Sequence, residues 1–347
     1  MGLPKKIPGD QAAKANYEED RLMTRYFLGV DGGGTKTEAG IVDGTGQLLG
    51  TGQAGPSNYD DVGADTAQAN ISLAVEAAKK NVDSPGAQFD AAFLGMAGLP
   101  SAKDRAIIRN IAQNLRLSSP ETTGVDSDVR IALAAGLGGR PGMVQIAGTG
   151  SHTFGMNAAG ESWRAGGWGH LLSDEGSGYW LGIQAMKAAV RATDGRINDT
   201  SLVERVQTHL GLDHMNEIMH RIYVGGLSRA DVAAMARLVI EAARQGDEVA
   251  LALLRQGGED LSKCVVAVAE RLGFADGPSE LATVGGLFEA GDVFAEPFRS
   301  AVVARLPRCH VIPAELPPVL GACMLAMRMV NLDTDGAIIE SLRRSVE

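Results

Sequence analysis

The sequence predicts an α/β protein made of two similar domains, and three observations support this prediction. Strand-like and helix-like segments alternate along most of the chain. A glycine turn between two apolar strands occurs near residue 33 and again near residue 149, which is typical of a duplicated unit. The 347 residues, 45% of them hydrophobic, are enough for two domains of about 150 residues each. A cleft between the domains would then be available to a ligand.

The first half opens with a predicted antiparallel meander. YFLGVD, EAGIVD and QLLGTG have the composition of strands, and the glycine-rich segments GGGTKT and DGTG separate them. A helix is expected at about 64–80, where alanine, isoleucine and valine recur at helical spacing, followed by a strand at 91–98 and a helix near 103–115. A segment ending at Val125 then leads to Asp128 and a further helix, which completes the first α/β unit.

The second half repeats this opening, with a strand, a glycine turn and a strand at 143–156. Helices are predicted at about 177–193, 229–244 and 247–271, a strand at 281–286, and a helix in PPVLGACMLAMRMV. The expected divisions are a flexible leader at 1–24, a first domain at 25–134, a second domain at 135–324, and a C-terminal helix at 325–347 that packs on the first domain. Met23, just before the first strand, is a candidate alternative start site.

Charge and cysteine content exclude several classes of function. A formal net charge of -10 disfavours nucleic acid and anionic membranes as partners, since both favour a basic surface. The charge says nothing about a nucleotide, because a phosphate site is built locally from backbone N–H groups and a few cations. Cys264, Cys309 and Cys323 form no CxxC pair, and no apolar run is long enough for a membrane span, so a cytoplasmic location is expected.

The first motif with chemical meaning is the run Asp31, Gly32, Gly33, Gly34, Thr35, Lys36. It is not a Walker A loop, because threonine follows the last glycine and a strand follows the turn, and it does not match a dinucleotide fingerprint. What remains is a tight hairpin turn whose bare backbone can approach phosphate oxygens, with Asp31 placed to hold a hydrated Mg²⁺ ion. An ordinary glycine turn is the competing interpretation.

A matching turn, Gly148, Thr149, Gly150, Ser151, occupies the same position in the second half. Two such turns in duplicated halves are less easily explained by chance than one, because facing hairpins can clamp a polyphosphate. Gly285 and Gly286 follow a third apolar strand, where an adenine or ribose could lie against the backbone, although a simple strand-ending turn also explains them.

Carboxylates supply the remaining candidate chemistry. Asp128 precedes a helix and could accept the proton of a sugar hydroxyl that attacks phosphorus, with a helix N-cap as the competing role and Asp126 as a rival base. Asp174 and Glu175, in GGWGHLLSDEGSGYWLG, could accept paired hydrogen bonds from vicinal hydroxyls, or could cap a helix. Asn58 is a polar loop residue with no distinctive signal of its own.

These segments together resemble the N-acetylglucosamine kinases of the BadF/BadG/BcrA/BcrD ATPase family, within the actin, hexokinase and heat-shock ATPase superfamily. GVDGGGTKT, the Asp128 segment, IAGTGS, GGWGHLLSDEGSGYW, VGG and PPVLGA occur in family order from about residue 26 to 326. The combination of GGWGH with DEGSGYW is the most specific. The leader has no recognised counterpart, and Ala165 stands where some relatives carry cysteine, so no thiol is expected in the mechanism.

The resemblance implies two ribonuclease H-like domains and an ATP-dependent transfer of phosphate to the 6-hydroxyl of N-acetylglucosamine. It places the ATP phosphates at the two glycine turns and adenosine at Gly285 and Gly286. It assigns the sugar to Asn58, Thr149, Asp174 and Glu175, the catalytic base to Asp128, and Mg²⁺, through water, to Asp31. A homodimer is also compatible with it.

Three alternatives stay open at this point. Within the same class, the acceptor could be glucosamine or N-acetylmuramic acid, because recognition of the sugar substituents depends on loop shape. The family also contains activator ATPases of 2-hydroxyacyl-CoA dehydratases and benzoyl-CoA reductases, which carry an iron–sulfur cluster and so need cysteine thiolates. The third is a sugar-sensing protein that has lost catalysis, which the intact Asp128 and phosphate turns disfavour.

Overall fold

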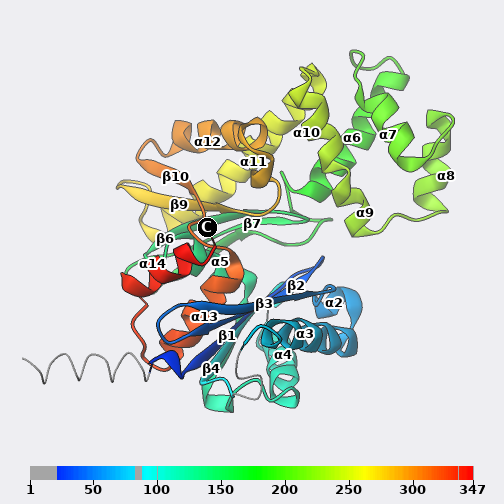
Figure 1. Ribbon diagram of the computed structural model, residues 1–347. Helices are drawn as coiled ribbons and strands as arrows, with labels where there is room; N and C mark the ends of the chain where they lie inside the picture. The colour runs from blue at the N-terminus through cyan, green and yellow to red at the C-terminus, as the bar shows by residue number, and fades with distance from the viewer. Residues whose placement is uncertain (1–21, 83–87, 100, 335, 347) are drawn as a thin grey trace, which may run out of the picture. The chain divides into compact units, whose positions relative to one another are not determined.

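The computed structural model describes residues 22–82, 88–99, 101–334 and 336–346, so the predicted leader lies, up to residue 21, outside the described residues. The described chain forms two compact units, each with its own five-stranded sheet (Figure 1). The first unit contains the residues up to Gly139 and those from Glu315 onward, and the second contains Arg140–Ala314. No helix in the described part of the chain is both long and apolar enough to cross a membrane.

The first unit has a mixed sheet in the order β3-β2-β1-β4-β5. The first three strands pair antiparallel, and β4 and β5 run parallel to β1. The strands are β1 Tyr26–Gly32, β2 Thr37–Asp43, β3 Leu48–Ala54, β4 Ala91–Met96 and β5 Thr123–Ser127. The helices are α2 Tyr59–Val62, α3 Ala64–Lys79, α4 Ala102–Asn114, the short 3-10 helix η1 Pro120–Thr122, α5 Asp128–Gly136, α13 Pro318–Met329 and α14 Ala337–Arg344.

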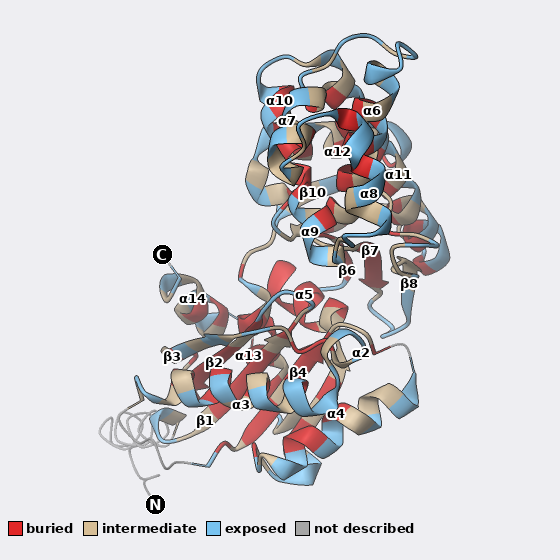
Figure 2. Ribbon diagram, turned by 90° about the vertical axis from the view of Figure 1, so that its right-hand side faces the viewer, coloured by how far each residue is buried: buried red, intermediate tan, exposed pale blue. Residues whose placement is uncertain are grey.

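Helices cover both faces of this sheet. Successive side chains of a strand point to opposite faces, so neighbouring residues of β1 pack in different clusters. Leu28 and Val30 of β1 pack in a cluster with α3 and α4, whereas Phe27 packs in a second cluster with α13 and α14. Figure 2 shows the buried residues concentrated on β1, β4 and α13. The C-terminal segment therefore supplies one of the two layers that cover the first sheet.

The second unit repeats the topology of the first. Its sheet has the order β10-β9-β6-β7-β8, which is the order of the first sheet read from the other edge, with β6 in the place of β1. The predicted α/β class and its duplication are therefore confirmed. The strands are β6 Gly142–Ala147, β7 Ser151–Met156, β8 Ser162–Gly166, β9 Ser279–Val284 and β10 Cys309–Pro313. The helices are α6 Gly178–Thr193, α7 Leu202–Leu210, η2 Met215–Glu217, α8 Ile218–Tyr223, α9 Arg229–Ala234, α10 Ala236–Arg244, α11 Glu248–Leu272, η3 Phe288–Ala290 and α12 Asp292–Arg305.

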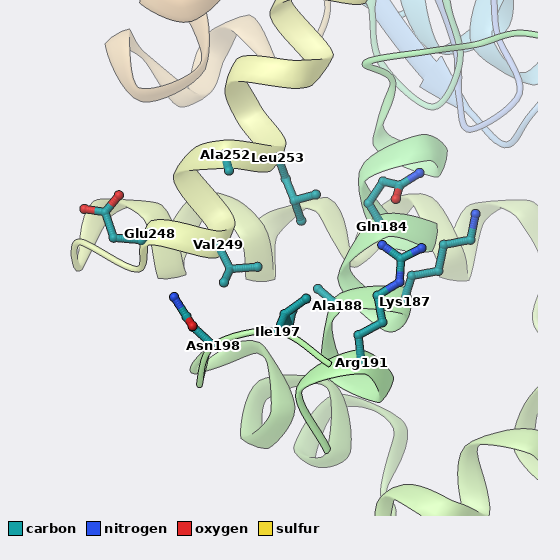
Figure 3. Close-up of a pocket in the computed structure, with 10 residues that line it drawn as sticks. All are labelled: Gln184, Lys187, Ala188, Arg191, Ile197, Asn198, Glu248, Val249, Ala252 and Leu253. Atoms are coloured by element: carbon teal, nitrogen blue, oxygen red, sulfur yellow. The ribbon is translucent and has the colours of Figure 1, made fainter. Parts of the chain in front are cut away.

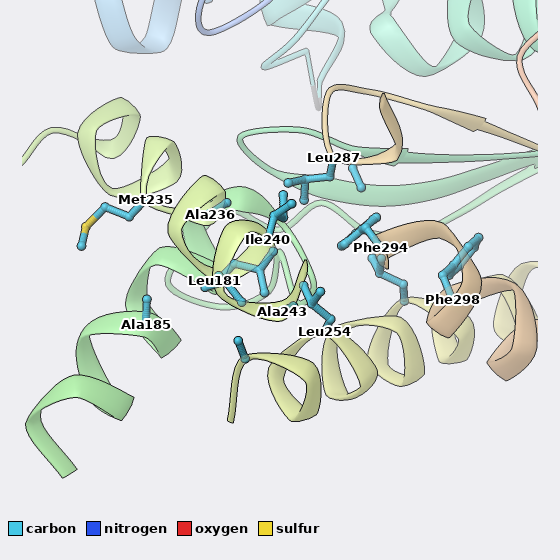
Figure 4. Close-up of a cluster of buried hydrophobic side chains, with 14 of the residues drawn as sticks. Leu181, Ala185, Met235, Ala236, Ile240, Ala243, Leu254, Leu287, Phe294 and Phe298 are labelled. Carbon is cyan, nitrogen blue, oxygen red and sulfur yellow. The ribbon is translucent and has the colours of Figure 1, made fainter. Parts of the chain in front are cut away.

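The core of the second unit lies between its sheet and these helices (Figure 4). Leu181 of α6, Ile240 of α10 and Leu254 of α11 are buried there, and Phe298 of α12 packs edge-on against Phe288 at 5.4 Å between ring centres. One sequence prediction needs correction. The helix expected at 229–244 is two helices, because near residue 235 the backbone switches to i→i+3 hydrogen bonds, from Met235 N to Val232 O and from Leu238 N to Met235 O.

Candidate active site

The parallel strands of the first sheet carry Asp31 and Asp128 to one edge. Gly32 at the end of β1 pairs with Met96, and Met96 pairs with Ser127 at the end of β5. Asp31 precedes Gly32, and Asp128 follows Ser127 as the first residue of α5. The carboxyl ends of parallel strands are the usual place for a ligand in α/β sheets.

The glycine turn at this edge is held closed by its own backbone. The Gly33 N–H donates to the Lys36 carbonyl at 2.9 Å, and the Gly33 carbonyl accepts from the backbone N–H groups of Ser57 at 3.1 Å and Asn58 at 3.2 Å. The Lys36 ammonium pairs with Glu38 at 2.8 Å. The structure therefore brings Asn58, which is remote in sequence, directly beside the turn.

Asn58 is itself almost completely buried and begins the short helix α2 as its N-cap. Its Nδ2 donates to Asp61 Oδ2 at 2.7 Å, and its Oδ1 accepts from the Asp60 N–H at 3.4 Å. These contacts orient the amide, so Asn58 has a structural role, and its role in binding stays a prediction.

The two candidate bases, Asp126 and Asp128, have different surroundings. Asp126 pairs with the guanidinium of Arg105 at 3.3 Å and with that of Arg130 at 3.6 Å, and it accepts from the Ser127 N–H at 2.8 Å. Asp128 accepts from the Ser127 hydroxyl at 2.9 Å. Ser127, and not Asp128, is the N-cap residue of α5. Two arginines engage Asp126, and the assignment of the base to Asp128 stays a prediction.

The Asp31 carboxyl has a pKa raised from 3.8 to about 7. Burial of the carboxyl is the largest cause, followed by the negative charges of Asp128 and Glu38, while Lys36 lowers the pKa. The buried Asp31 carboxyl thus lies near two further carboxylates, and these surroundings oppose its ionisation.

This pKa predicts a pH-dependent effect of the substitution Asp31→Asn. The folded protein holds the proton more tightly than the unfolded chain, so its free energy of unfolding falls as pH rises from about 4 to 7 and stays lowered above that. The substituted amide cannot titrate, and the melting temperature of D31N relative to wild type should therefore increase from pH 5 to pH 8. Melting curves in EDTA measure this, with Asp65→Asn on the exposed start of α3 as a control. A difference that does not change with pH would contradict the assignment.

In the second unit, the turn Gly148–Ser151 is attached to the start of α6. The Gly148 N–H donates to the Gly150 carbonyl at 2.9 Å, which closes the turn. The Gly148 carbonyl accepts from the Gly178 N–H at 2.8 Å, and the Thr149 carbonyl from the Tyr179 N–H at 3.2 Å. The helix therefore fixes the conformation of the turn.

The structure brings Asp174 and Glu175 to this same turn. The Ser151 hydroxyl donates to the Glu175 carbonyl at 2.7 Å, and the Ser151 N–H lies 3.4 Å from Asp174 Oδ1. Asp174 has a left-handed backbone with φ of 64°, and Arg229 Nη2 lies 3.1 Å from its Oδ2. Arg229 was not predicted from the sequence, because its local pattern, SRAD, indicates only a capped helix start.

Gly285 and Gly286 lie at the corresponding edge of the second sheet. They follow β9, whose Val284 pairs in parallel with Ile146 just before the Gly148 turn. A Cβ atom on Gly285, where φ is 110°, would lie 2.4 Å from the Ala147 carbonyl oxygen, so glycine is required there. A Cβ on Gly286 would meet no atom within 4 Å, which leaves this backbone open to a ligand.

Two hollows lie along α6 in this unit. The larger, about 310 Å³, contains none of the predicted site residues and is lined by Gln184, Lys187, Ala188, Arg191, Ile197, Asn198, Glu248, Val249, Ala252 and Leu253 (Figure 3). The smaller, about 250 Å³, includes Glu175 and the loop from His170 to Ser173. Only the smaller hollow therefore adjoins the candidate site.

The chain is similar to known proteins along most of its length. Residues 28–326 match the model of the BadF/BadG/BcrA/BcrD ATPase family. The chain is 30% identical over 302 residues to an N-acetylmuramic acid/N-acetylglucosamine kinase of Clostridium acetobutylicum, covering 87% of this chain and 98% of that protein. It is 30% identical over 316 residues to an N-acetyl-D-glucosamine kinase of Dictyostelium discoideum, covering 88% and 99%.

A solved structure agrees with these matches. A candidate N-acetylglucosamine kinase from Chromobacterium violaceum superimposes with a TM-score of 0.70 at 29% identity, covering 87% of this chain and 99% of that one. The family match covers both glycine turns and the acidic residues described above. The chain therefore belongs to the BadF/BadG/BcrA/BcrD ATPase family.

Proposed function

We propose that this protein is an ATP-dependent amino-sugar kinase that phosphorylates the 6-hydroxyl of N-acetylglucosamine. The observation that carries the proposal is the repeated edge geometry: in each unit a closed glycine turn follows the central strand and has a carboxylate beside it, Asp31 in the first and Asp174 in the second. The acceptor class is supported by the relatives that are named as N-acetylglucosamine and N-acetylmuramic acid kinases.

In this mechanism the backbone of both turns, Gly32–Lys36 and Gly148–Ser151, binds the ATP phosphates, and Gly285 and Gly286 contact adenosine. Asn58, Thr149, Asp174 and Glu175 orient the sugar through its hydroxyls. Asp128 accepts the 6-hydroxyl proton as the sugar oxygen forms its bond to the γ-phosphorus. The bond between that phosphorus and the β–γ bridging oxygen breaks, and ADP leaves.

The residues at the first turn fit a Mg²⁺ ion that accompanies ATP. Carboxylate oxygens are the ligands this ion prefers, and Mg²⁺ commonly uses one or two of them together with waters and substrate phosphates. Asp31 would hold the ion through water. Burial first, and the charges of Asp128 and Glu38 second, raise the pKa of Asp31 to about 7, and a bound cation would offset these effects. When bound, Mg²⁺ neutralises charge on the phosphates. Binding should displace the proton of Asp31.

A coupled ADP-release assay tests the proposal across N-acetylglucosamine, glucosamine, N-acetylmuramic acid, glucose and no sugar. N-acetylglucosamine is expected to give the highest kcat/KM, and turnover without sugar is expected to be low, because an occupied, water-excluding site is needed to favour transfer over hydrolysis. Faster turnover with glucosamine or N-acetylmuramic acid would reassign the acceptor. ADP release that no sugar accelerates would refute the kinase proposal.

The cysteines disfavour the activator-ATPase alternative. Cys264, Cys309 and Cys323 lie in α11, β10 and α13, and all three are free thiols. Burial raises the pKa of Cys264 to about 11 and that of Cys323 to about 12, and also raises the pKa of Cys309. Cluster ligands must be thiolates, which these surroundings oppose.

We further propose that the protein acts in the cytoplasm, and a homodimer is compatible with the family resemblance. Three free cysteines suit a reducing compartment, and light scattering after gel filtration measures the oligomeric state. A monomer at micromolar concentration would contradict the dimer.

A further inference from the structure

Arg229 lies at the candidate sugar site although nothing in the sequence marks it. It is the first residue of α9, directly after the N-cap Ser228, whose capping box with Asp231 fixes the start of the helix. Its Nη2 donates to Asp174 Oδ2 at 3.1 Å. The capping box therefore fixes the backbone position of Arg229, and the ion pair fixes the position of its guanidinium.

The ion pair also contacts the phosphate turn. A Cβ atom placed on Gly150 would lie 2.9 Å from Arg229 Nη2 and 3.0 Å from Asp174 Oδ2. The turn, the carboxylate and the guanidinium thus meet at one point, and glycine at position 150 leaves room for all three. A substitution at any one of these three residues should therefore alter the packing of the other two.

The two members of the pair differ in exposure. The Asp174 side chain is 4% exposed and that of Arg229 is 32% exposed. Arg229 Nε is buried and has no hydrogen-bond partner among the described residues. A buried carboxylate is strongly unfavourable unless a cation compensates it. Arg229 supplies that compensation through its Nη2.

We propose that Arg229 is a positioning residue that determines specificity for a neutral amino sugar. By pairing with Asp174 it holds the carboxylate in place for sugar hydroxyls and cancels its charge. An unpaired buried carboxylate would attract the ammonium group of glucosamine from several ångströms away, because the interaction is strong where water is excluded. The paired site does not discriminate against the uncharged acetamido group of N-acetylglucosamine. This inference rests on the proposed function, with Asp174 as a sugar ligand.

The variant Arg229→Gln tests the inference. It should raise KM for N-acetylglucosamine about tenfold and shift the kcat/KM ratio about tenfold toward glucosamine at pH 7. The ammonium of glucosamine, like an α-amino group, loses its proton at a pH of about 8, so the shift should disappear at pH 9. Arg229→Lys keeps the charge and should retain the wild-type preference.

Two further variants separate positioning from general damage. If Arg229 acts through Asp174, the double variant D174N/R229Q should be no worse than D174N alone. Arg196→Gln removes an exposed arginine that pairs with Asp194 in the same unit and should change neither KM nor preference. Melting curves establish whether each variant folds. If R229Q does not fold, the sugar preference of Arg229→Met is compared with that of Arg229→Lys.

The results that would overturn the inference are specific. An unchanged sugar preference in R229Q or R229M, a shift toward glucosamine that persists at pH 9, or additive effects in the double variant would each refute it. Failure of the proposed function is seen separately and earlier, as wild-type protein that no sugar stimulates.

Discussion

Replacing Asp128 by asparagine is expected to lower kcat for sugar phosphorylation about 10²–10⁴-fold, the usual contribution of a general base. Asparagine has nearly the same shape and can still accept the hydrogen bond that the Ser127 hydroxyl donates at 2.9 Å. The amide has no useful basicity, so the proton of the attacking hydroxyl has no acceptor. Initial rates over a range of sugar concentrations should show the loss in kcat, with KM for the sugar changed little.

Asp126→Asn is the matched control for this prediction, because Asp126 is two residues away and is also acidic. Its carboxylate pairs with Arg105 and Arg130, so the variant should lower the melting temperature while most of kcat remains. If D126N loses activity and D128N keeps it, the base is Asp126. If both remain active, neither Asp126 nor Asp128 is the base.

Replacing Gly321 by alanine should be among the most destabilising single substitutions in the first unit. A Cβ atom there would lie 2.1 Å from the Ile131 carbonyl oxygen and 2.7 Å from the Ala135 N. Both contacts are with the backbone of α5, which cannot rotate away. Overpacking costs about 1–3 kcal/mol and more where the backbone must move, so α13 should shift away from α5. Thermal melting and the yield of folded protein measure the effect.

Gly277→Ala is the control for Gly321→Ala. A Cβ on Gly277 would meet no atom within 4 Å, and the substitution should leave the melting temperature almost unchanged. A melting temperature for G321A close to that of wild type would mean that α13 and α5 can separate at little cost.

The duplicated fold could be predicted from the sequence because its signals are local. The glycine turns after β1 and β6 and the alternation of strands with helices are visible in short windows, and they locate both sheets. The break near Met235 could not be predicted, because the apolar residues of α9 and α10 continue at helical spacing across it. The helices α7 and α8 were not predicted, and they are only nine and six residues long.

The candidate site was predicted only in part, for a physical reason. Residues that precede or follow a strand, such as Asp31 and Asp128, are placed by the parallel register and can be inferred from the sequence. The pairing of Arg229 with Asp174 joins residues 55 positions apart, and the pairing of Asp126 with Arg105 joins residues 21 positions apart. Such contacts depend on how helices pack, which one sequence does not reveal.

The return of the chain to the first unit from Glu315 onward has a consequence for the order of folding during synthesis. Residues 140–314 form one uninterrupted stretch, and every layer of their core has been synthesised before the ribosome reaches Glu315. The first unit, although synthesised earlier, lacks α13 at that stage, so Phe27 and Val42 have no covering helix. The second unit can therefore fold first. Until α13 is synthesised, the first unit exposes one apolar face of its sheet, and nascent chains with exposed apolar surface are those that most need chaperones.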